Sequence, residues 1–148
     1  MFNVVLIEPE IPPNTGNIGR LCLATCSTLH LVKPLGFSTD DRELKRAGLD
    51  YWKEVDVRLW DSFGDWQRTI GADARTFFLT TKSDRAYTDV RFRPGDSLVF
   101  GRETKGLPDA LLAAYPERLL TIPMVGTRSL NLATAVAIVL FEAVRQQR

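Results

Sequence analysis

Small polar residues and glycines follow directly after buried-looking apolar runs in the last third of the chain. Residues 97–100 lead into Gly101-Arg102-Glu103-Thr104-Lys105-Gly106, and residues 119–122 lead into Pro123-Met124 and then Arg128-Ser129-Leu130-Asn131. Glycine and small side chains leave main-chain N–H and C=O groups open to a ligand. The pattern therefore predicts a ligand pocket built largely from backbone.

Polar side chains that are able to act on a substrate lie at these and other predicted strand ends and helix starts. They are Asn14, Arg20, Glu103, Ser129 and Asn131. All of them except Ser129 also have a structural alternative: Asn14 and Asn131 suit a tight turn and a helix N-cap, respectively. Arg20 suits a solvated helix face, and Glu103 suits an ion pair with a neighbouring cation. Open α/β sheets bind ligands at the carboxyl ends of their strands, so the joint occurrence of these residues favours a functional site.

Common catalytic and nucleotide-binding motifs are missing where they would be required. Gly101 and Gly106 have the spacing of a triphosphate-binding loop, but Leu107-Pro108 stands in place of the required Lys and Ser or Thr. No Gly-x-Gly-x-x-Gly follows the first apolar run, and Ser129 has no Gly-x-Ser-x-Gly elbow. The single histidine and two cysteines do not furnish an ordinary zinc site, so no metal is expected.

Apolar runs alternate with helical patterns along the whole chain. Strands are predicted at residues 3–7, 29–32, 55–60, 76–80, 97–100 and 119–122. Helices are predicted at residues 18–27, 40–48, 62–70 and 131–146. The prolines before Asn17 are expected to keep residues 8–17 in a loop. Such alternation is typical of βαβ units, so the predicted fold class is α/β with a parallel sheet.

The composition limits the class of protein. The chain has 148 residues, 45% of them hydrophobic and 25% charged, with a net charge of +1, which suits one domain over residues 1–148. The N-terminus lacks a signal peptide, and the apolar stretch 133–141 is too short to cross a bilayer, so a cytoplasmic protein without membrane contact is expected. Cys22 and Cys26 are expected to be free thiols that share one buried face of the first helix.

The last predicted helix is apolar on nearly all sides. Its apolar members include Ala135, Val136, Ile138, Val139, Leu140, Phe141 and Val144. A helix of this kind needs cover on more than one face. In so short a chain the second cover is expected to be another copy, which predicts a homodimer.

Three motifs, taken in order, resemble those of the SPOUT superfamily of RNA methyltransferases. They are Asn14-Thr15-Gly16-Asn17-Ile18-x-Arg20, then Phe100-Gly101-x-Glu103-x-x-Gly106-Leu107, then Ile122-Pro123-Met124 with Ser129-Leu130-Asn131. The short length and the segment Glu8–Asn17 look like the TrmL (YibK) type, and the resemblance covers essentially the whole chain. That type methylates the ribose 2′-hydroxyl of the wobble nucleotide, a pyrimidine, in certain leucine tRNAs.

The resemblance implies a fold, a cofactor and an assembly. SPOUT proteins pass their C-terminal segment through a loop to form a trefoil knot, whereas most chains are unknotted. They bind S-adenosylmethionine in the knot loops at a dimer interface. By this resemblance, cofactor contacts would come from Leu79, Thr80, Gly101, Ile122, Met124, Ser129 and Leu130.

The resemblance also assigns catalytic roles, to Arg20, Glu103 and Asn131. The motif-one arginine, here Arg20, acts at the cofactor of the partner subunit, while Glu103, Ser129 and Asn131 orient the ribose and hold the loops. Arginine has a pKa above ~12 and is a poor general base, so gripping phosphate and stabilising the developing alkoxide is favoured over literal proton abstraction. The alternatives are methylation at another tRNA or rRNA position and a non-catalytic RNA-binding dimer.

RNA contacts outside the motifs are less specific. Arg42, Lys45 and Arg46 share one predicted helix, and Arg91 and Arg93 share a loop. Either group suits RNA phosphates or a solvated face. Tryptophans are available to stack on unpaired bases, but nothing in the sequence assigns one to that role.

Overall fold

A six-stranded parallel sheet forms the middle layer of the computed structural model, which describes the backbone of residues 1–148 and every side chain except that of Asp50. The strands are β1 (Asn3–Ile7), β2 (Thr28–Val32), β3 (Val57–Trp60), β4 (Thr76–Leu79), β5 (Ser97–Phe100) and β6 (Leu119–Leu120). Their order is β3-β2-β1-β5-β4-β6, and every pair is parallel. The predicted α/β class with a parallel sheet is confirmed, although β3 and β6 are shorter than expected.

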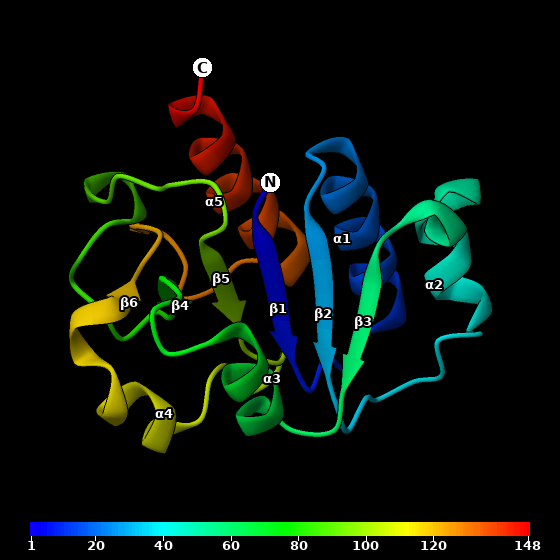
Figure 1. Cartoon of the computed structure of the whole chain (residues 1–148), viewed down its shortest axis with the longest axis horizontal. Helices are drawn as coiled ribbons and strands as arrows, with labels where there is room; N and C mark the ends of the chain where they lie inside the picture. The colour runs from blue at the N-terminus through cyan, green and yellow to red at the C-terminus, as the bar shows by residue number, and fades with distance from the viewer.

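Helices cover both faces of this sheet (Figure 1). The α-helices are α1 (Pro12–Ala24), α2 (Arg42–Ala47), α3 (Phe63–Ile70), α4 (Asp109–Ala114) and α5 (Leu132–Gln146), and the 3₁₀ turns are η1 (Leu49–Glu54), η2 (Tyr87–Asp89) and η3 (Pro116–Arg118). Helices α1 and α5 pack together on one face, with α2 and η1 against α1, and α3 and α4 cover the other face. Among the described residues, none of the helices has the length and apolarity that a membrane crossing requires.

Alternate residues of each strand face opposite helix layers. In β1, Val4 and Leu6 belong to the core formed with α1 and α5. Val5 and Ile7 belong to a second core with Trp66 of α3 and with α4. Because helices cover both faces, every position of such a strand is buried, which explains why the strands read as continuous apolar runs.

Helix α1 begins at Pro12, not at Ile18 as the sequence pattern indicates. Pro12 and Pro13 occupy its first positions, where helix N–H groups have no partner inside the helix and the fixed φ of proline suits helical geometry. The prediction that prolines keep residues 8–17 in a loop is therefore wrong. Ile11, at the N-cap position, supplies no side-chain cap, but the two prolines have no N–H, and the N–H groups of Asn14 and Thr15 donate to the carbonyl of Ile11 at 3.1 and 3.4 Å.

The same helix also ends earlier than predicted. Its last residue is Ala24, and the N–H of Ser27 donates to the carbonyl of Cys22 at 2.8 Å while Cys26 has φ +52°. This left-handed residue closes the helix in the manner of a Schellman motif. Cys22 is consequently buried and Cys26 exposed, so the predicted shared buried face is wrong.

Two glycines of α1 allow neighbouring elements to approach it closely. A Cβ on Gly16 would lie 2.1 Å from the carbonyl oxygen of Leu44 in α2, and a Cβ on Gly19 would lie 2.8 Å from the ring of Trp52 in η1. Real Cβ atoms do not tolerate such distances, so these glycines set how α2 and η1 dock on the helix that carries Arg20.

We expect Gly16→Ala to lower the free energy of unfolding by at least about 1 kcal/mol, because the backbone of α2 must move. The higher helix propensity of alanine offsets only about 1 kcal/mol of that strain. Gly126→Ala is the matched control, since a Cβ there would meet nothing within 4 Å. Urea unfolding followed by circular dichroism measures both variants, and equal midpoints would contradict the packing role.

The only histidine of the chain, His30, is buried in β2. The indole N–H of Trp60 donates to His30 Nδ1 at 3.0 Å, and His30 Nε2 lies 2.9 Å from Asn3 Oδ1. An indole nitrogen only donates, so Nδ1 is the acceptor and Nε2 carries the proton of a neutral ring. Burial, reinforced by the nearby Arg58, lowers the pKa of His30 to about 4.

Stability is expected to fall as the pH drops from 6.5 to 4. In this window the unfolded chain protonates its histidine, whose ordinary pKa is 6.5, while the folded chain keeps His30 neutral down to about pH 4. The unfolded state then binds more protons, and the difference in pKa corresponds to roughly 3 kcal/mol. Thermal unfolding of the wild type and of His30→Gln between pH 4 and 7 checks this: the wild type should lose stability more steeply, and parallel curves would refute it.

Candidate functional site

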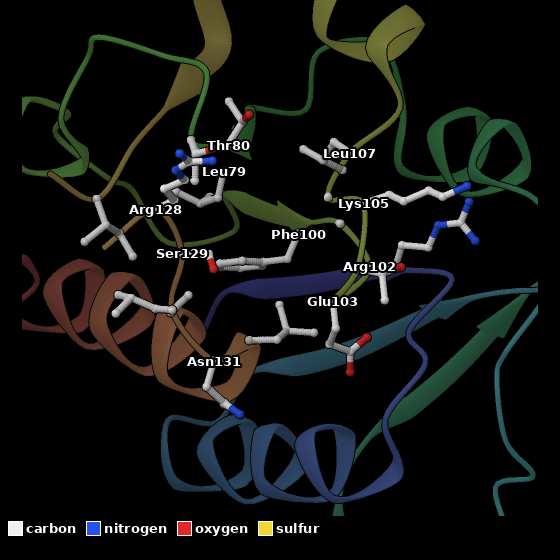
Figure 2. A pocket seen from close by; sticks show the side chains of 18 of the residues that line it. Leu79, Thr80, Phe100, Arg102, Glu103, Lys105, Leu107, Arg128, Ser129 and Asn131 are labelled. Atoms are coloured by element: carbon white, nitrogen blue, oxygen red, sulfur yellow. The ribbon is translucent and has the colours of Figure 1, made fainter. Parts of the chain in front are cut away.

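A cleft of about 580 Å³ opens at the carboxyl ends of β4, β5 and β6 (Figure 2). It is lined by every residue predicted to contact a cofactor: Leu79, Thr80, Gly101, Ile122, Met124, Ser129 and Leu130. Glu103 and Asn131 line it as well. These residues come from segments far apart in the sequence, and the parallel sheet gathers them because the carboxyl ends of its strands meet at one edge.

The cleft combines apolar walls with polar groups. Leu79, Phe100 and Ile122 contribute apolar surface, and the exposed Ser129 contributes a hydroxyl. Its volume lies within the range of small-molecule sites, roughly 300–1,000 Å³. The cleft therefore suits a nucleoside-sized ligand that has a flat apolar ring and polar edges.

The loop after β5, residues 101–106, is a tight turn that requires its glycines. A Cβ on Gly101 would lie 2.1 Å from the carbonyl carbon of Gly106, and Gly106 itself has φ +66°. The N–H of Gly106 donates to the carbonyl of Arg102 at 2.8 Å and closes the turn. Close backbone approach at Gly101 thus occurs within the loop itself, which presents this compact turn to the cleft.

The carboxylate of Glu103 holds the beginning of α1. Its Oε1 accepts a hydrogen bond from the N–H of Glu10 at 2.8 Å, and its Oε2 accepts one from the N–H of Ile11 at 2.9 Å. Oε2 also accepts a bond from Asn14 Nδ2 at 3.2 Å. A negative charge at this end of a helix is favoured by the helix dipole, and Glu103 places a carboxylate there while it binds the two N–H groups that precede α1. Because both oxygens are engaged, the structure gives Glu103 a positioning role in place of an ion pair.

A second carboxylate joins the same two loops in the opposite direction. Oε1 of Glu10 accepts bonds from the N–H of Thr104 at 3.0 Å and from its hydroxyl at 2.8 Å. The bonds from Thr104 lower the pKa of Glu10. The loops after β1 and β5 are therefore fastened reciprocally. Sequence reasoning missed the pair of Glu10 and Thr104, and the only signal for it was that both residues lie in loops that follow strands.

Asn14 links this fastening to the last helix. While its Nδ2 donates to Glu103, its Oδ1 accepts a bond from Asn131 Nδ2 at 3.0 Å. Asn131 Oδ1 in turn caps α5 by accepting the N–H groups of Ala133 and Thr134. The N-cap prediction for Asn131 is confirmed, and its other amide atom joins the Glu103–Asn14 network at the cleft.

Arg20 lies apart from the cleft. It is exposed on α1 and lines a second hollow between α1 and α5, together with Leu21, Tyr51, Ala133 and Ala137. Asn131 lines both hollows. A single chain therefore does not place Arg20 against its own cleft, and the resemblance to SPOUT proteins assigns Arg20 to the cofactor of a partner subunit.

A model of the SpoU rRNA Methylase family matches residues 1–141 of the chain. The chain belongs to this family. The match spans all strands, the cleft, the whole of α1 and the first part of α5, up to residue 141.

This SpoU-family chain is similar to proteins of known activity and structure. A tRNA (cytidine(34)-2'-O)-methyltransferase from Burkholderia pseudomallei (strain 1106a) is 50% identical over 152 residues, covering 99% of this chain and 96% of the relative. A solved structure on "the 2-OH methylation of C/U34 on tRNA" superposes with a TM-score of 0.95 at 47% identity, covering 99% and 96%. An AdoMet-bound rRNA methyltransferase from Sinorhizobium meliloti superposes with a TM-score of 0.87 at 27% identity, covering 99% of this chain and 57% of that one.

The arginines, lysine and tryptophans that the sequence offers as further RNA contacts lie in different parts of this SpoU-family structure. Arg91 and Arg93 precede β5 and so lie at the amino ends of the strands, opposite the cleft. The cations of α2 are exposed on a helix that packs against α1. The tryptophans serve packing: Trp66 is buried, Trp60 bonds His30, and Trp52 covers Gly19.

Proposed function

We propose that this chain transfers a methyl group from S-adenosylmethionine to the ribose 2′-hydroxyl of the wobble pyrimidine in tRNA, with leucine tRNAs as substrates. The observation that carries the proposal is the cleft at the carboxyl ends of β4 to β6, which gathers the whole predicted cofactor set. Similarity over nearly the full length to a tRNA (cytidine(34)-2'-O)-methyltransferase supports the choice of nucleotide. The AdoMet-bound family structure supports the choice of methyl donor.

The cleft fits S-adenosylmethionine in size and in lining. Leu79 and Ile122 would hold the faces of the adenine, and the main chain beside them would read its edges. Met124, Ser129 and Leu130 would surround the methionine part. When bound, S-adenosylmethionine supplies a methyl group on a sulfonium sulfur, which is a good leaving group.

The residues of the chain must align the ribose hydroxyl and manage its charge. Methyl transfer is an in-line displacement, so most of the protein's contribution is orientation. Arg20 would contact the RNA and, through its positive charge, stabilise the alkoxide that develops as the hydroxyl loses its proton to solvent. Ser129 and Asn131, at the boundary of the cleft, would orient the ribose, and Glu103 would hold the loops that form the site.

The position of Arg20 supports the proposal of a homodimer. Arg20 lines the second hollow of the chain and not the cleft, whereas Asn131 lines both. The face of α5 beside the second hollow is incompletely covered, with Phe141 44% exposed. A second copy docked on α1 and α5 would cover this apolar surface and would bring its Arg20 to the cleft of the first copy.

The proposal extends to the remaining family features. We propose that the chain forms one domain over residues 1–148, carries a trefoil knot at its C-terminal end and works in the cytoplasm. The TM-score of 0.95 to a wobble-methylation structure supports the shared fold. A cleft formed by loops after three neighbouring strands, with α5 following directly, is consistent with knotted loops.

The test is to incubate the protein with labelled S-adenosylmethionine and leucine tRNA and to map the modified nucleotide. Label is expected on the 2′-oxygen of nucleotide 34, and a tRNA with a 2′-deoxy nucleotide at that position serves as the control without an acceptor. Label at another ribose would move the substrate site, and label on a base would overturn the reaction type. Tight RNA binding without transfer would identify a non-catalytic RNA-binding protein.

A further inference from the structure

The mouth of the cofactor cleft carries an excess of positive charge. Its positively charged lining residues are Lys82, Arg102, Lys105 and Arg128, and its negatively charged lining residue is Glu103. The carboxylate of Glu103 is already occupied by the start of α1. Since the net charge of the whole chain is only +1, this is a local concentration.

Two of these cations are free to receive a ligand. Lys82 pairs with Asp109 at 2.8 Å, and Arg102 lies 3.8 Å from Glu8. Lys105 and Arg128 are exposed, and among the described side chains neither has an acidic partner within 4.0 Å. Figure 2 shows them on opposite sides of the cleft, with Arg128 beside Leu79 and Lys105 beyond Leu107.

The proposed cofactor does not account for these cations. S-adenosylmethionine carries one carboxylate, one ammonium and one sulfonium group, so its net charge is positive. Unpaired cations at the rim repel such a ligand on balance, and their presence indicates a second ligand that is anionic. A ribose that enters the cleft is part of an RNA backbone, whose phosphates on either side of that ribose must pass over the rim.

We propose that Lys105 and Arg128 form a clamp that holds, from opposite walls of the cleft, the RNA phosphates that flank the target ribose. The inference rests on the proposed function for its substrate, and it adds which side chains bind that substrate at the reacting nucleotide. Phosphate contacts fix the register of a nucleic acid without reading its sequence, which is what a methyl transfer to ribose requires. The clamp thus positions the target hydroxyl, while recognition of the tRNA lies elsewhere.

The experiment measures tRNA affinity as a function of salt for the wild type, Lys105→Gln, Arg128→Gln and the double variant. Each lost phosphate contact should reduce the slope of log K against log salt by about 0.7–0.9, so the double variant should lose roughly 1.4–1.8. Arg93→Gln is the matched control: it removes an exposed cation at the opposite end of the sheet and should leave the slope unchanged. Calorimetry should find the affinity for S-adenosylmethionine within a factor of about three of the wild type in every variant.

The outcomes separate the clamp from the proposed function. An unchanged slope in the double variant, an equal reduction in Arg93→Gln, or a loss of affinity for S-adenosylmethionine would each overturn the clamp. Normal labelling of nucleotide 34 by a double variant with an unchanged slope would reject the clamp alone. A wild type that binds tRNA through the clamp but labels a different nucleotide would reject the proposed substrate site alone.

Discussion

Arg20→Ala is expected to slow wobble methylation by about a hundredfold or more, the cost of removing one charge-stabilising donor from a transition state. The affinity for S-adenosylmethionine should survive, because Arg20 lies outside the cleft of its own chain. Fold stability should also survive, because the side chain is exposed on α1. Single-turnover rates at saturating tRNA measure the chemical step, and calorimetry measures cofactor binding.

Arg68→Ala is the control for this loss of charge. It removes an arginine from α3, on the face of the sheet opposite α1, and should leave the methylation rate near that of the wild type. Near-normal turnover by Arg20→Ala would remove Arg20 from the mechanism. A parallel loss of cofactor affinity would assign it a binding role instead.

Glu103→Gln is expected to lower the free energy of unfolding by about 2 kcal/mol and to weaken cofactor binding, because charge-assisted bonds of this kind contribute about 1.5–3 kcal/mol. The carboxylate accepts the N–H groups of Glu10 and Ile11 on separate oxygens. An amide replaces one oxygen with a second donor, which then faces a backbone N–H. The turn 101–106 is thereby loosened at the cleft. Denaturant unfolding and titration with S-adenosylmethionine measure the two effects.

Glu117→Gln provides the comparison for Glu103→Gln. Glu117 is exposed in η3, so its substitution should change stability by less than about 0.5 kcal/mol. If both variants unfold at the same denaturant concentration and bind cofactor equally well, the hydrogen bonds of Glu103 to the residues before α1 contribute nothing to the site. A slower methylation rate in Glu103→Gln with unchanged cofactor affinity would instead place its carboxylate at the substrate.

Mixing the two defective variants tests the composite site. In a heterodimer of Arg20→Ala with Glu103→Gln, one of the two sites combines an intact cleft with an intact Arg20 from the partner. At an S-adenosylmethionine concentration too low to load the weakened Glu103→Gln cleft, random exchange of subunits should therefore restore roughly a quarter of the wild-type activity. No recovery after denaturing and refolding the mixture would argue for sites built within one chain, provided that refolded wild type regains its activity.

Local sequence patterns determined the elements of this protein well where the interactions are local. β1 and β5, the N-cap Ser62 and the N-cap Asn131 lie where apolar runs and short polar side chains predict them. Each depends on contacts within a few residues or on burial on both faces of a strand. The start of α1 could not be predicted in this way, because the two residues before it, Glu10 and Ile11, donate their N–H groups to Glu103, 92 residues from Ile11.

The residues of the candidate site were also largely evident from the sequence, since the ligand edge of a parallel sheet is marked by glycines and small polar residues after each strand. Only the tertiary structure decided which of these residues line the cleft and which lie outside it. It gathered the predicted cofactor residues in one cleft, and it placed Arg20 in another hollow, because that side chain is exposed on α1 beside the residues of α5. It also showed that Asn14 and Glu103 fasten loops, a role set by pairwise contacts across the fold that side-chain type and spacing do not encode.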